Sequence, residues 1–324
     1  MATKKATSWF LTERGRKFSF FVLTGSGIGL MAARFVPNTL LISKYKDFVQ
    51  YYSNGKPVEL PEKINQLHQK CLDVLNISNV HRKLISPFSV YGYDLFHAGC
   101  SSSKFGMLVG IPVNFSYKTE EDVKKDNIQV NQRSVDWTSE VGQKLAESLV
   151  LPEKVQQFAI CREILMALNN KVIYESTYPF ACIFLAYNLA TYLNRRLNLY
   201  RAPVATRGML YSLIGMFSTG LYFLMKDMTE VHYETETDKK LCELGRDYIE
   251  SGVIFYDKLL QRNQALRVLM GNEGQKKYSV HGNENFGLRQ PRVALVHRKQ
   301  YFEERLKEIT QEESSDDAIT EQEI

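Results

Sequence analysis

The sequence predicts an α-helical multi-pass membrane protein with a mixed α+β water-facing region. Three observations support this fold class: three apolar stretches that lack charge, an arginine-rich loop between the last two, and a soluble composition elsewhere. The 324-residue chain is 44% hydrophobic and has a mean hydropathy of -0.27. A protein made mostly of membrane helices is far more apolar, so most of this chain is expected to lie in water.

The first predicted span, an N-terminal anchor, covers residues 18–36. Phe18–Ala33 carries no charge, and the side chain of Arg34 can extend to the membrane interface. The second and third spans cover 176–194 and 208–225 and form a helical hairpin. A spanning helix needs about 20 residues, so each stretch is marginal alone, and a buried core helix is the alternative for each. Together they favour three transmembrane helices.

Glycines in the first span also indicate how it could pack. Gly25 and Gly29 have the small-xxx-small spacing that lets two membrane helices approach closely. Glycines that are merely tolerated in a membrane helix are the alternative.

The distribution of charge predicts the orientation. The loop 195–207 contains Arg195, Arg196, Arg201 and Arg207 without an acidic residue, and the tail 1–17 is also basic. Short loops rich in Lys and Arg stay on the side from which insertion occurs. The tail and this loop therefore share one side, and the large segments face the other.

These boundaries predict eight regions. They are a basic tail (1–17), first span (18–36), soluble α+β segment (37–175), second span (176–194), arginine-rich loop (195–207), third span (208–225), mainly helical soluble segment (226–302) and acidic, disordered tail (303–324).

Periodicity predicts elements within the water-facing segments. Helical spacing appears over 60–75, 147–174 and 238–270, where Gly271 ends the last pattern. A polar stretch over 118–126 is expected to be an exposed loop. Two largely apolar runs, 88–93 and 105–115, predict strands, with Gly106, Gly110 and Pro112 as turn or bulge markers.

Motifs that carry chemistry are missing. The five cysteines have no paired spacing, so they are expected to be inert thiols, and no two of the six histidines lie at ligand spacing on one helical face. There is no nucleotide-binding loop, no nucleophile elbow and no basic element typical of nucleic-acid binding. We therefore expect no enzyme activity, no cofactor, and no catalytic, cofactor-binding or metal-binding residues.

The order of the predicted helices and membrane segments resembles that of one class of enzyme. Membrane-embedded zinc metallopeptidases also have a helix, two membrane segments and a second helix that bears acids, with HExxH on the first helix. Here Arg162-Glu163-Ile-Leu-Met166 stands in that place, and arginine cannot ligate zinc. Glu163 and Asp238 are then relics of a lost zinc site, or Glu163 is an ion-pairing surface or interface residue.

Several stretches carry a resemblance to a known family. They are GVIFYDKLLQRNQALR at 252–267, LMGNEGQKKY at 269–278, VGIPVNF at 109–115, VDW at 135–137 and QFAICRE at 157–163. With the order of the apolar segments, they resemble the transmembrane protein 177 family from the first span to about Asn283. The acidic tail departs from the family pattern.

The resemblance implies a non-enzymatic factor in the mitochondrial inner membrane, with its N-terminus in the matrix and its large segments in the intermembrane space. It implies a role in early maturation of cytochrome c oxidase subunit 2. The implied partners are newly synthesised subunit 2, its membrane assembly chaperone and the lipid bilayer. The alternatives are a metallopeptidase-like protein with a lost zinc site and an unrelated endoplasmic reticulum protein. In the latter case the triplets at Asn76 and Asn114 would face the lumen as glycosylation sites.

Overall fold

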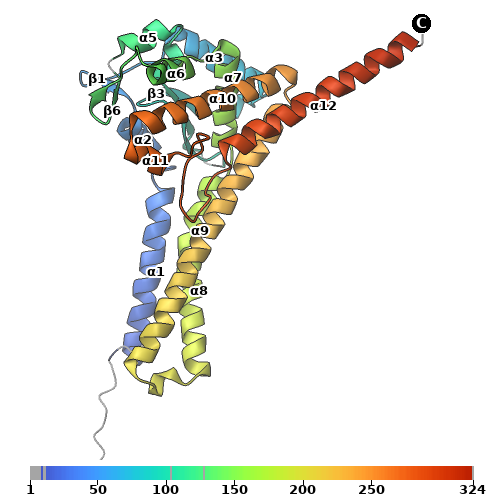
Figure 1. Cartoon of the computed structure of the whole chain (residues 1–324). Helices are drawn as coiled ribbons and strands as arrows, with labels where there is room; N and C mark the ends of the chain where they lie inside the picture. Colours follow the sequence, from blue (N-terminus) through green and yellow to red (C-terminus); the bar gives the residue numbers. More distant parts are fainter. Residues whose placement is uncertain (1–8, 10–11, 103, 127, 323–324) are drawn as a thin grey trace, which may run out of the picture. The chain divides into compact units, whose positions relative to one another are not determined.

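The computed structural model describes residues 9, 12–102, 104–126 and 128–322, and these form two compact units. Unit 1 comprises residues up to Leu41 together with Asn170–Glu230, and unit 2 comprises Ile42–Asn169 and Val231 onward. Helix α9 (Val204–Cys242) contributes to both (Figure 1).

Unit 1 is built from α1 (Glu13–Phe35), α8 (Lys171–Arg196), the short 3₁₀ helix η3 (Leu199–Arg201) and the first part of α9. Helices α1 and α8 pack antiparallel, with Phe20 beside Tyr187 and Gly27 beside Phe180. A Cβ on Gly27 would lie 2.9 Å from the Phe180 ring, whereas nothing lies within 4 Å of a Cβ on Gly25 or Gly29. Within the described residues, the close approach of α1 to α8 is therefore made by Gly27 and not by Gly25 or Gly29.

Polar contacts join α8 to α9 along the hairpin. Asn194 donates to the Tyr211 hydroxyl at 3.0 Å near the loop end, and the hydroxyls of Tyr178 and Thr229 lie 2.6 Å apart. At the other end, the Lys171 ammonium lies 2.6 Å from Glu230. A further ion pair at this end joins Arg34 on α1 to Glu175 on α8.

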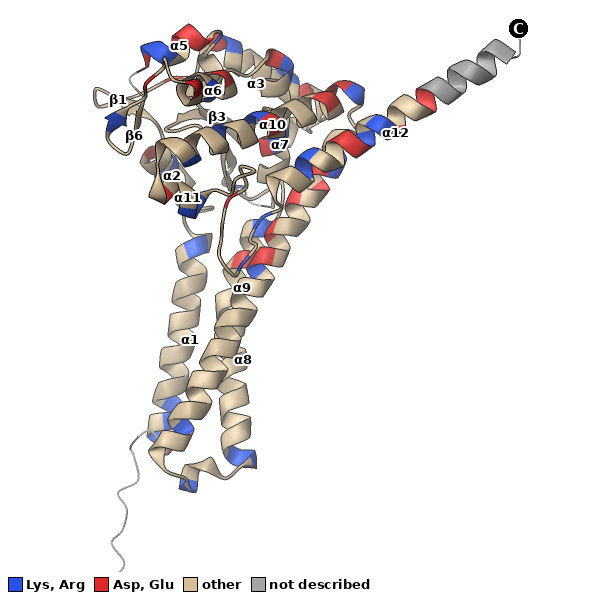
Figure 2. Ribbon diagram, in the orientation of Figure 1, with Lys and Arg blue, Asp and Glu red and all other residues tan. Residues whose placement is uncertain are grey.

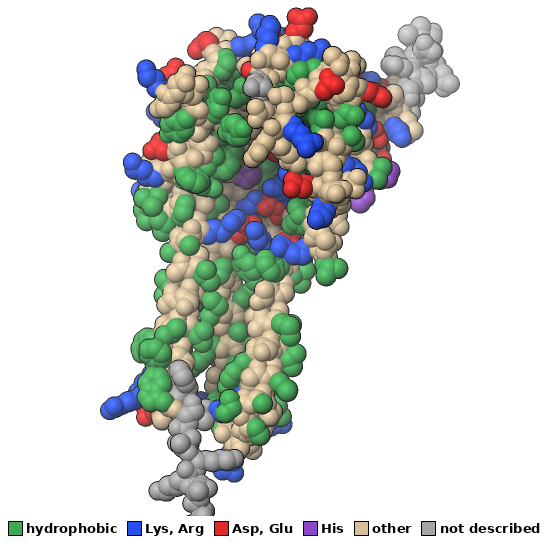
Figure 3. All heavy atoms as spheres, turned by 60° about the vertical axis from the view of Figure 1, so that its left-hand side comes forward, with side chains coloured by type: hydrophobic (Ala, Val, Ile, Leu, Met, Phe, Trp, Pro, Cys, Tyr) green, Lys and Arg blue, Asp and Glu red, His purple; other side chains and the backbone are tan. Residues whose placement is uncertain are grey.

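Charge is distributed unevenly over unit 1. Lys and Arg gather at the start of α1 and at the turn between α8 and α9, while the helices between these ends are almost uncharged (Figure 2). Hydrophobic side chains cover the visible face of the same helices (Figure 3). Such a surface is unstable in water over this length and suits a bilayer.

Among the described residues, two helices are long and apolar enough to cross a membrane, α1 and α9. The structure thus supports a helical membrane protein with two candidate spans, fewer than the three predicted. Helix α8 contains the predicted range 176–194 and has 26 residues. Its apolar character is diluted by Pro179, Asn188 and several tyrosines. The third predicted span lies within α9, which continues without a break past residue 225 to Cys242.

Unit 2 surrounds a small mixed sheet. Strand β3 (Ile85–Val90) pairs parallel with β5 (Met107–Pro112), and β4 (Phe96–Gly99) pairs antiparallel with the other edge of β5, giving the order β3-β5-β4. The predicted strands overlap β3 and β5, whereas β4 was not predicted. Gly106 adopts a positive φ of 101° in the turn before β5, but Gly110 lies inside the regular strand.

Helices pack around this sheet. They are α2 (Ile42–Val49), α3 (Glu62–Val74), α4 (Asn79–Arg82), α5 (Glu120–Lys125), α6 (Glu140–Leu149), α7 (Glu153–Ala167), the end of α9, α10 (Arg246–Leu269), α11 (Asn272–Lys277) and α12 (Leu295–Gln322). Smaller elements are the hairpins β1 (Tyr52–Ser53) with β2 (Lys56–Pro57) and β6 (Gln129–Val130) with β7 (Arg133–Ser134), and the 3₁₀ helix η2 (Val113–Ser116).

The core of unit 2 lies where α7, α10 and α12 meet. Phe158, Tyr256 and Phe302 are fully buried and their rings contact one another. Gly252 on α10 allows this packing, because a Cβ there would lie 2.5 Å from the Phe302 ring. Aromatic side chains bury large apolar areas, so this cluster stabilises the unit.

Two sequence expectations in unit 2 were wrong. The stretch 118–126, expected to be a loop, contains α5, which begins with a capping box between Thr119 and Asp122. The stretch 303–324, expected to be disordered, continues α12 to Gln322. Its first turns are held by core contacts of Leu306 and Ile309 and by the ion pair of Arg305 with Glu308, 2.7 Å apart.

Candidate functional site: a cleft over a buried ion cluster

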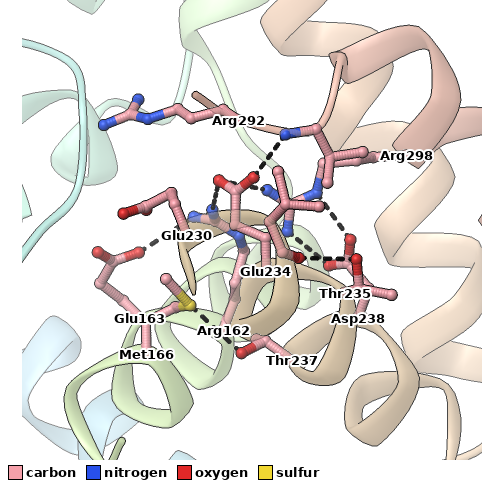
Figure 4. Close-up of polar contacts among 12 residues, drawn as sticks. Arg162, Glu163, Met166, Glu230, Glu234, Thr235, Thr237, Asp238, Arg292 and Arg298 are labelled. Atoms are coloured by element: carbon pink, nitrogen blue, oxygen red, sulfur yellow. Dashed lines mark hydrogen bonds and ion pairs between the residues drawn. The ribbon is translucent and has the colours of Figure 1, made fainter. Parts of the chain in front are cut away.

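The most unusual feature of unit 2 is a buried cluster of ionised side chains. Arg162 and Glu163 come from α7, Glu234 and Asp238 from the end of α9, and Arg298 from the first turns of α12. Figure 4 shows these side chains pointing toward one another from the three helices. Charged residues are almost never fully buried unless they are paired, so the partners decide what the cluster can do.

Arg298 is the centre of the cluster and is only 2% exposed. Its Nε and Nη2 donate to the two carboxylate oxygens of Asp238, each at 2.7 Å, and its Nη1 lies 3.1 Å from Glu234. Burial alone would lower the pKa of Arg298, but the charge of Asp238 more than offsets this effect and the pKa is raised. The guanidinium is therefore a permanent cation.

Tyr256 on α10 completes this side of the cluster. Its hydroxyl donates to Asp238 at 2.9 Å, and its ring lies under the guanidinium of Arg298, 4.8 Å away. Burial raises the pKa of Tyr256, so the hydroxyl keeps its proton and acts as a donor.

Arg162 links the two remaining carboxylates. Its Nη1 donates to Glu163 at 3.1 Å, and its Nη2 lies 3.7 Å from Glu234. The other oxygen of Glu163 lies 2.5 Å from Nδ1 of His97 on β4. Each carboxylate is thus held by a cationic or hydrogen-bonding partner, which satisfies the requirement for burying charge.

The two residues singled out from the sequence lie in this one cluster. Glu163 is ion-paired as expected, but it is buried rather than at a surface. Asp238 pairs with Arg298. Met166, one turn after Arg162, also faces α9, where its sulfur accepts a hydrogen bond from Thr237 at 3.3 Å. Sequence reasoning missed Arg298, Glu234 and His97.

The paired charges of this cluster are typical of a structural ion network. Carboxylates already neutralised by guanidinium groups are poor metal ligands, and an arginine supplies no lone pair. Within the described part of the chain, no group of three or more His, Cys, Asp or Glu could hold a metal ion. None of the five cysteines, all of which lie in the described residues, forms a disulfide bond, and four of them are buried.

Above the cluster, unit 2 contains a cleft of about 740 Å³. Its floor includes Arg162, Glu234 and Arg298, and its walls come from Tyr93–Leu95, the end of α6, the middle of α10 and the segment 279–294. This volume is within the range of about 300–1,000 Å³ that is typical of binding pockets.

The segment 279–294 crosses between α11 and α12 and is fastened at both ends. The amide of Val293 donates to Glu234 at 2.8 Å, so the segment contacts the ion cluster directly. At the other end, Asn263 on α10 donates to the carbonyl of Gly282, also at 2.8 Å. The middle of the segment is exposed, including Phe286 and Leu288.

Comparison with known proteins identifies the family. The family model described as Transmembrane protein 177 matches residues 10–323. The chain belongs to this family. The match extends through the region that the sequence analysis set apart as an acidic addition.

Relatives named Transmembrane protein 177 cover most of the chain. The protein of Xenopus laevis is 28% identical over 278 residues, which is 85% of this chain and 89% of the relative. The protein of Danio rerio is 29% identical, and the match covers 84% of this chain and 90% of the relative. The protein of Homo sapiens is 28% identical, and the match covers 72% of this chain and 74% of the relative. No solved structure matches the chain significantly. The family description and the relatives' names state a membrane protein without naming an enzymatic activity.

Proposed function

We propose that this member of the transmembrane protein 177 family is a non-enzymatic assembly and stabilising factor in the early maturation of cytochrome c oxidase subunit 2. It acts in the mitochondrial inner membrane together with the membrane chaperone of that subunit. The observation that carries the proposal is the family match over residues 10–323. The sequence resemblance implies this role for members of the family.

The chemistry of the described residues is compatible with binding rather than catalysis. The buried carboxylates of unit 2 are occupied by Arg162 and Arg298, so none is placed as a general base. The cleft above them offers a surface for a partner. A stabilising factor needs such a surface and an anchor in the partner's membrane.

We further propose that all three predicted spans cross the membrane. Arg195 and Arg196 at the end of α8 and Arg207 near the start of α9 then lie in the matrix with the N-terminus. Helix α8 is less apolar than α1, but its partners α1 and α9 supply polar contacts, such as that of Tyr178 with Thr229. The segments 37–175 and 226–302 face the intermembrane space.

The proposal is tested by purifying the tagged full chain from mitochondria after pulse-labelling of mitochondrial translation products. We expect newly made subunit 2 to co-purify, together with its membrane chaperone. A tagged, unrelated inner-membrane protein of similar abundance serves as the control. Recovery of no subunit 2 above that control contradicts the proposal.

A second candidate is a metallopeptidase-like protein whose zinc site is lost. It is motivated by the sequence, in which Arg162 and Met166 stand where the two histidines of HExxH would stand; in the structure both side chains contact α9. On this reading a guanidinium replaces the metal as the cation that holds the carboxylates together. A remaining catalytic role requires Glu163 and Asp238, so normal function of Glu163→Gln and Asp238→Asn would exclude it.

A further inference from the structure

Two large apolar side chains of unit 2 project into solvent from segments that are held close to a membrane helix. Leu288, in the segment 279–294, is fully exposed, and Phe48 on α2 is 86% exposed. Single exposed apolar side chains are common on water-soluble surfaces. These two differ because short stretches of chain connect each of them to α1 or α9, the two helices that are long and apolar enough to cross a membrane.

A tight turn displays Leu288. The amide of Arg289 donates to the carbonyl of Phe286 at 3.4 Å, which closes a β-turn with Leu288 at its tip. Gly287 supplies a positive φ of 65°, which a residue with a side chain rarely adopts. Phe286, Gly287 and Arg289 line the cleft, whereas Leu288 does not. The leucine therefore points away from the cleft and into solvent.

The segment that carries this turn is fastened to α9 near the apolar part of that helix. The amide of Val293 donates to Glu234 at 2.8 Å. Glu234 follows Met225, the last residue before the charges of α9 begin, by nine residues, which is a rise of about 14 Å. The five residues from Val293 back to Leu288 span up to about 17 Å. The headgroup region extends about 5–8 Å beyond each face of the hydrocarbon core, so Leu288 is within reach of it.

Helix α2 is connected to the end of α1 by a compact linker. The amide of Leu41 donates to the carbonyl of Val36, the residue after α1, at 2.9 Å, so the linker folds back on itself. Phe48 comes six residues after Ile42, the first residue of α2, which is a rise of about 9 Å. The end of the first span therefore keeps Phe48 close to the membrane surface.

The two sides of α2 have different surroundings. Ile42, Tyr45 and Val49 pack against the sheet of unit 2. Lys44 and Phe48 are four residues apart, so they share one helical face, and both are exposed. A helix that presents a basic and an aromatic side chain on its free face is suited to a membrane interface.

Basic side chains accompany the turn as well. Residues 285–294 include Arg289 and Arg292 and no acidic residue, and both arginines are exposed. Arg292 lies 4.0 Å from Glu284 at the surface, where such a pair contributes little. Lys and Arg next to a bilayer are attracted to anionic headgroups. An apolar tip with adjacent basic residues therefore matches an anionic lipid surface.

We propose that unit 2 contacts the membrane at two points, the turn at Leu288 and the free face of α2 at Phe48, whose apolar side chains enter the headgroup region of an anionic leaflet. Arg289, Arg292 and Lys44 then interact with lipid phosphates. In Figure 1 both α2 and the segment between α11 and α12 lie on the side of unit 2 away from α5. The proposal requires α1 and α9 as membrane helices but no particular client, so it goes beyond the proposed function and can fail without it.

The test measures lipid contact by tryptophan fluorescence. Leu288→Trp or Phe48→Trp is made in the full chain with both native tryptophans replaced (Trp9→Phe, Trp137→Phe), and the protein is reconstituted in nanodiscs of phosphatidylcholine and phosphatidylglycerol. The phosphatidylcholine either is unmodified or carries bromine near the ester end of its acyl chains, where bromine quenches tryptophan only at short range. We expect brominated lipid to lower the emission of both variants at least twofold. Both sites are exposed, so the variants should fold.

The matched control is Lys124→Trp in the same background, because Lys124 is exposed on α5, on the other side of unit 2 (Figure 1). Brominated lipid should leave its emission almost unchanged. If Leu288→Trp or Phe48→Trp is quenched no more than this control, the proposal is overturned. Shielding of that tryptophan from the water-soluble quencher acrylamide would then show that protein covers the site instead of lipid.

The role of charge is tested in the same system. Omission of phosphatidylglycerol, or Arg289→Gln together with Arg292→Gln, should weaken the quenching of Leu288→Trp at least twofold. The double substitution should leave the quenching of Phe48→Trp as it was, because Lys44 is still present. Quenching of Leu288→Trp that depends neither on lipid charge nor on the two arginines would overturn the assignment of an anionic lipid surface.

Discussion

Arg298 on α12 holds Asp238 on α9 through two parallel hydrogen bonds of 2.7 Å, and both side chains are buried. The pair fastens the start of the C-terminal helix to the end of the longest helix. It also fixes the segment 279–294 that precedes Arg298, because Glu234 binds both this arginine and the amide of Val293. The shape of the cleft therefore depends on it.

Removal of one partner should be strongly destabilising. Arg298→Leu leaves Asp238 and Glu234 buried without their guanidinium, and we expect a loss of about 3–5 kcal/mol in the unfolding free energy of unit 2. The double variant Arg298→Leu with Asp238→Leu should lose less than the sum of the single variants. Urea unfolding of the full chain in micelles, followed by near-ultraviolet circular dichroism, measures both. Strictly additive losses would show that the two residues do not interact.

The buried histidine of α3 should make stability depend on pH. Burial lowers the pKa of His68 from 6.5 to about 4, and its ring nitrogens have no hydrogen-bond partner among the described residues. Between these values the unfolded chain binds more protons than the folded chain, so stability rises with pH. The contribution is complete above pH 6.5 and falls by roughly 3 kcal/mol as the pH drops toward 4.

His68→Leu should remove this part of the pH dependence. Unfolding of both proteins is compared between pH 4.5 and 7.5, so that other titrating groups cancel. The exposed His297→Leu serves as the control and should follow the wild type. A slope that stays unchanged in His68→Leu would contradict the assignment.

The contact of α1 with α8 depends on Gly27. Gly27→Leu places a side chain where Phe180 lies, so unit 1 should lose about 1–3 kcal/mol through overpacking. Gly25→Leu has open space and should have little effect. The midpoint of thermal unfolding in micelles distinguishes the two variants. Equal midpoints would mean that α1 and α8 do not pack through Gly27.

Topology is tested by protease protection with an epitope at each end of the full chain. In mitochondria both ends should be protected. In mitoplasts the C-terminal epitope should be lost and the N-terminal one retained, because three spans place the ends on opposite sides. Loss of both epitopes in mitoplasts would fit two spans. A glycosidase-sensitive mass shift at the exposed Asn76 would place the protein in the endoplasmic reticulum; Asn114 is buried and is not suited to carry a glycan.

The sequence predicted those features that depend on local residue patterns. The apolar stretches in α1 and α9, the pairing of Glu163 and the end of α10 before Gly271 all follow from spacing or composition. Strand β4 was missed because a strand of four residues is too short to show a clear alternation of apolar and polar side chains. Helix α5 was missed because its charged residues were interpreted as an exposed loop, although Thr119 and Asp122 form a capping box that marks the start of a helix.

The site itself could not be predicted, since its residues come together only through tertiary packing. Arg298 has no local partner that marks it as buried, and Asn114 lies in a short 3₁₀ helix far from α10 in the sequence. One feature of the sequence pointed to the site. Arg262 and Arg298 lie on the apolar sides of α10 and α12, and buried arginines require partners.

The most direct test of the account is the lifetime of newly made cytochrome c oxidase subunit 2. Cells that lack this protein are pulse-labelled for mitochondrial translation and chased, with wild-type chain or an empty vector restored. The account predicts that subunit 2 is degraded several-fold faster with the empty vector, while other mitochondrially made subunits decay as before, and that the wild-type chain restores its lifetime. Identical decay of subunit 2 with and without the protein would contradict a stabilising role.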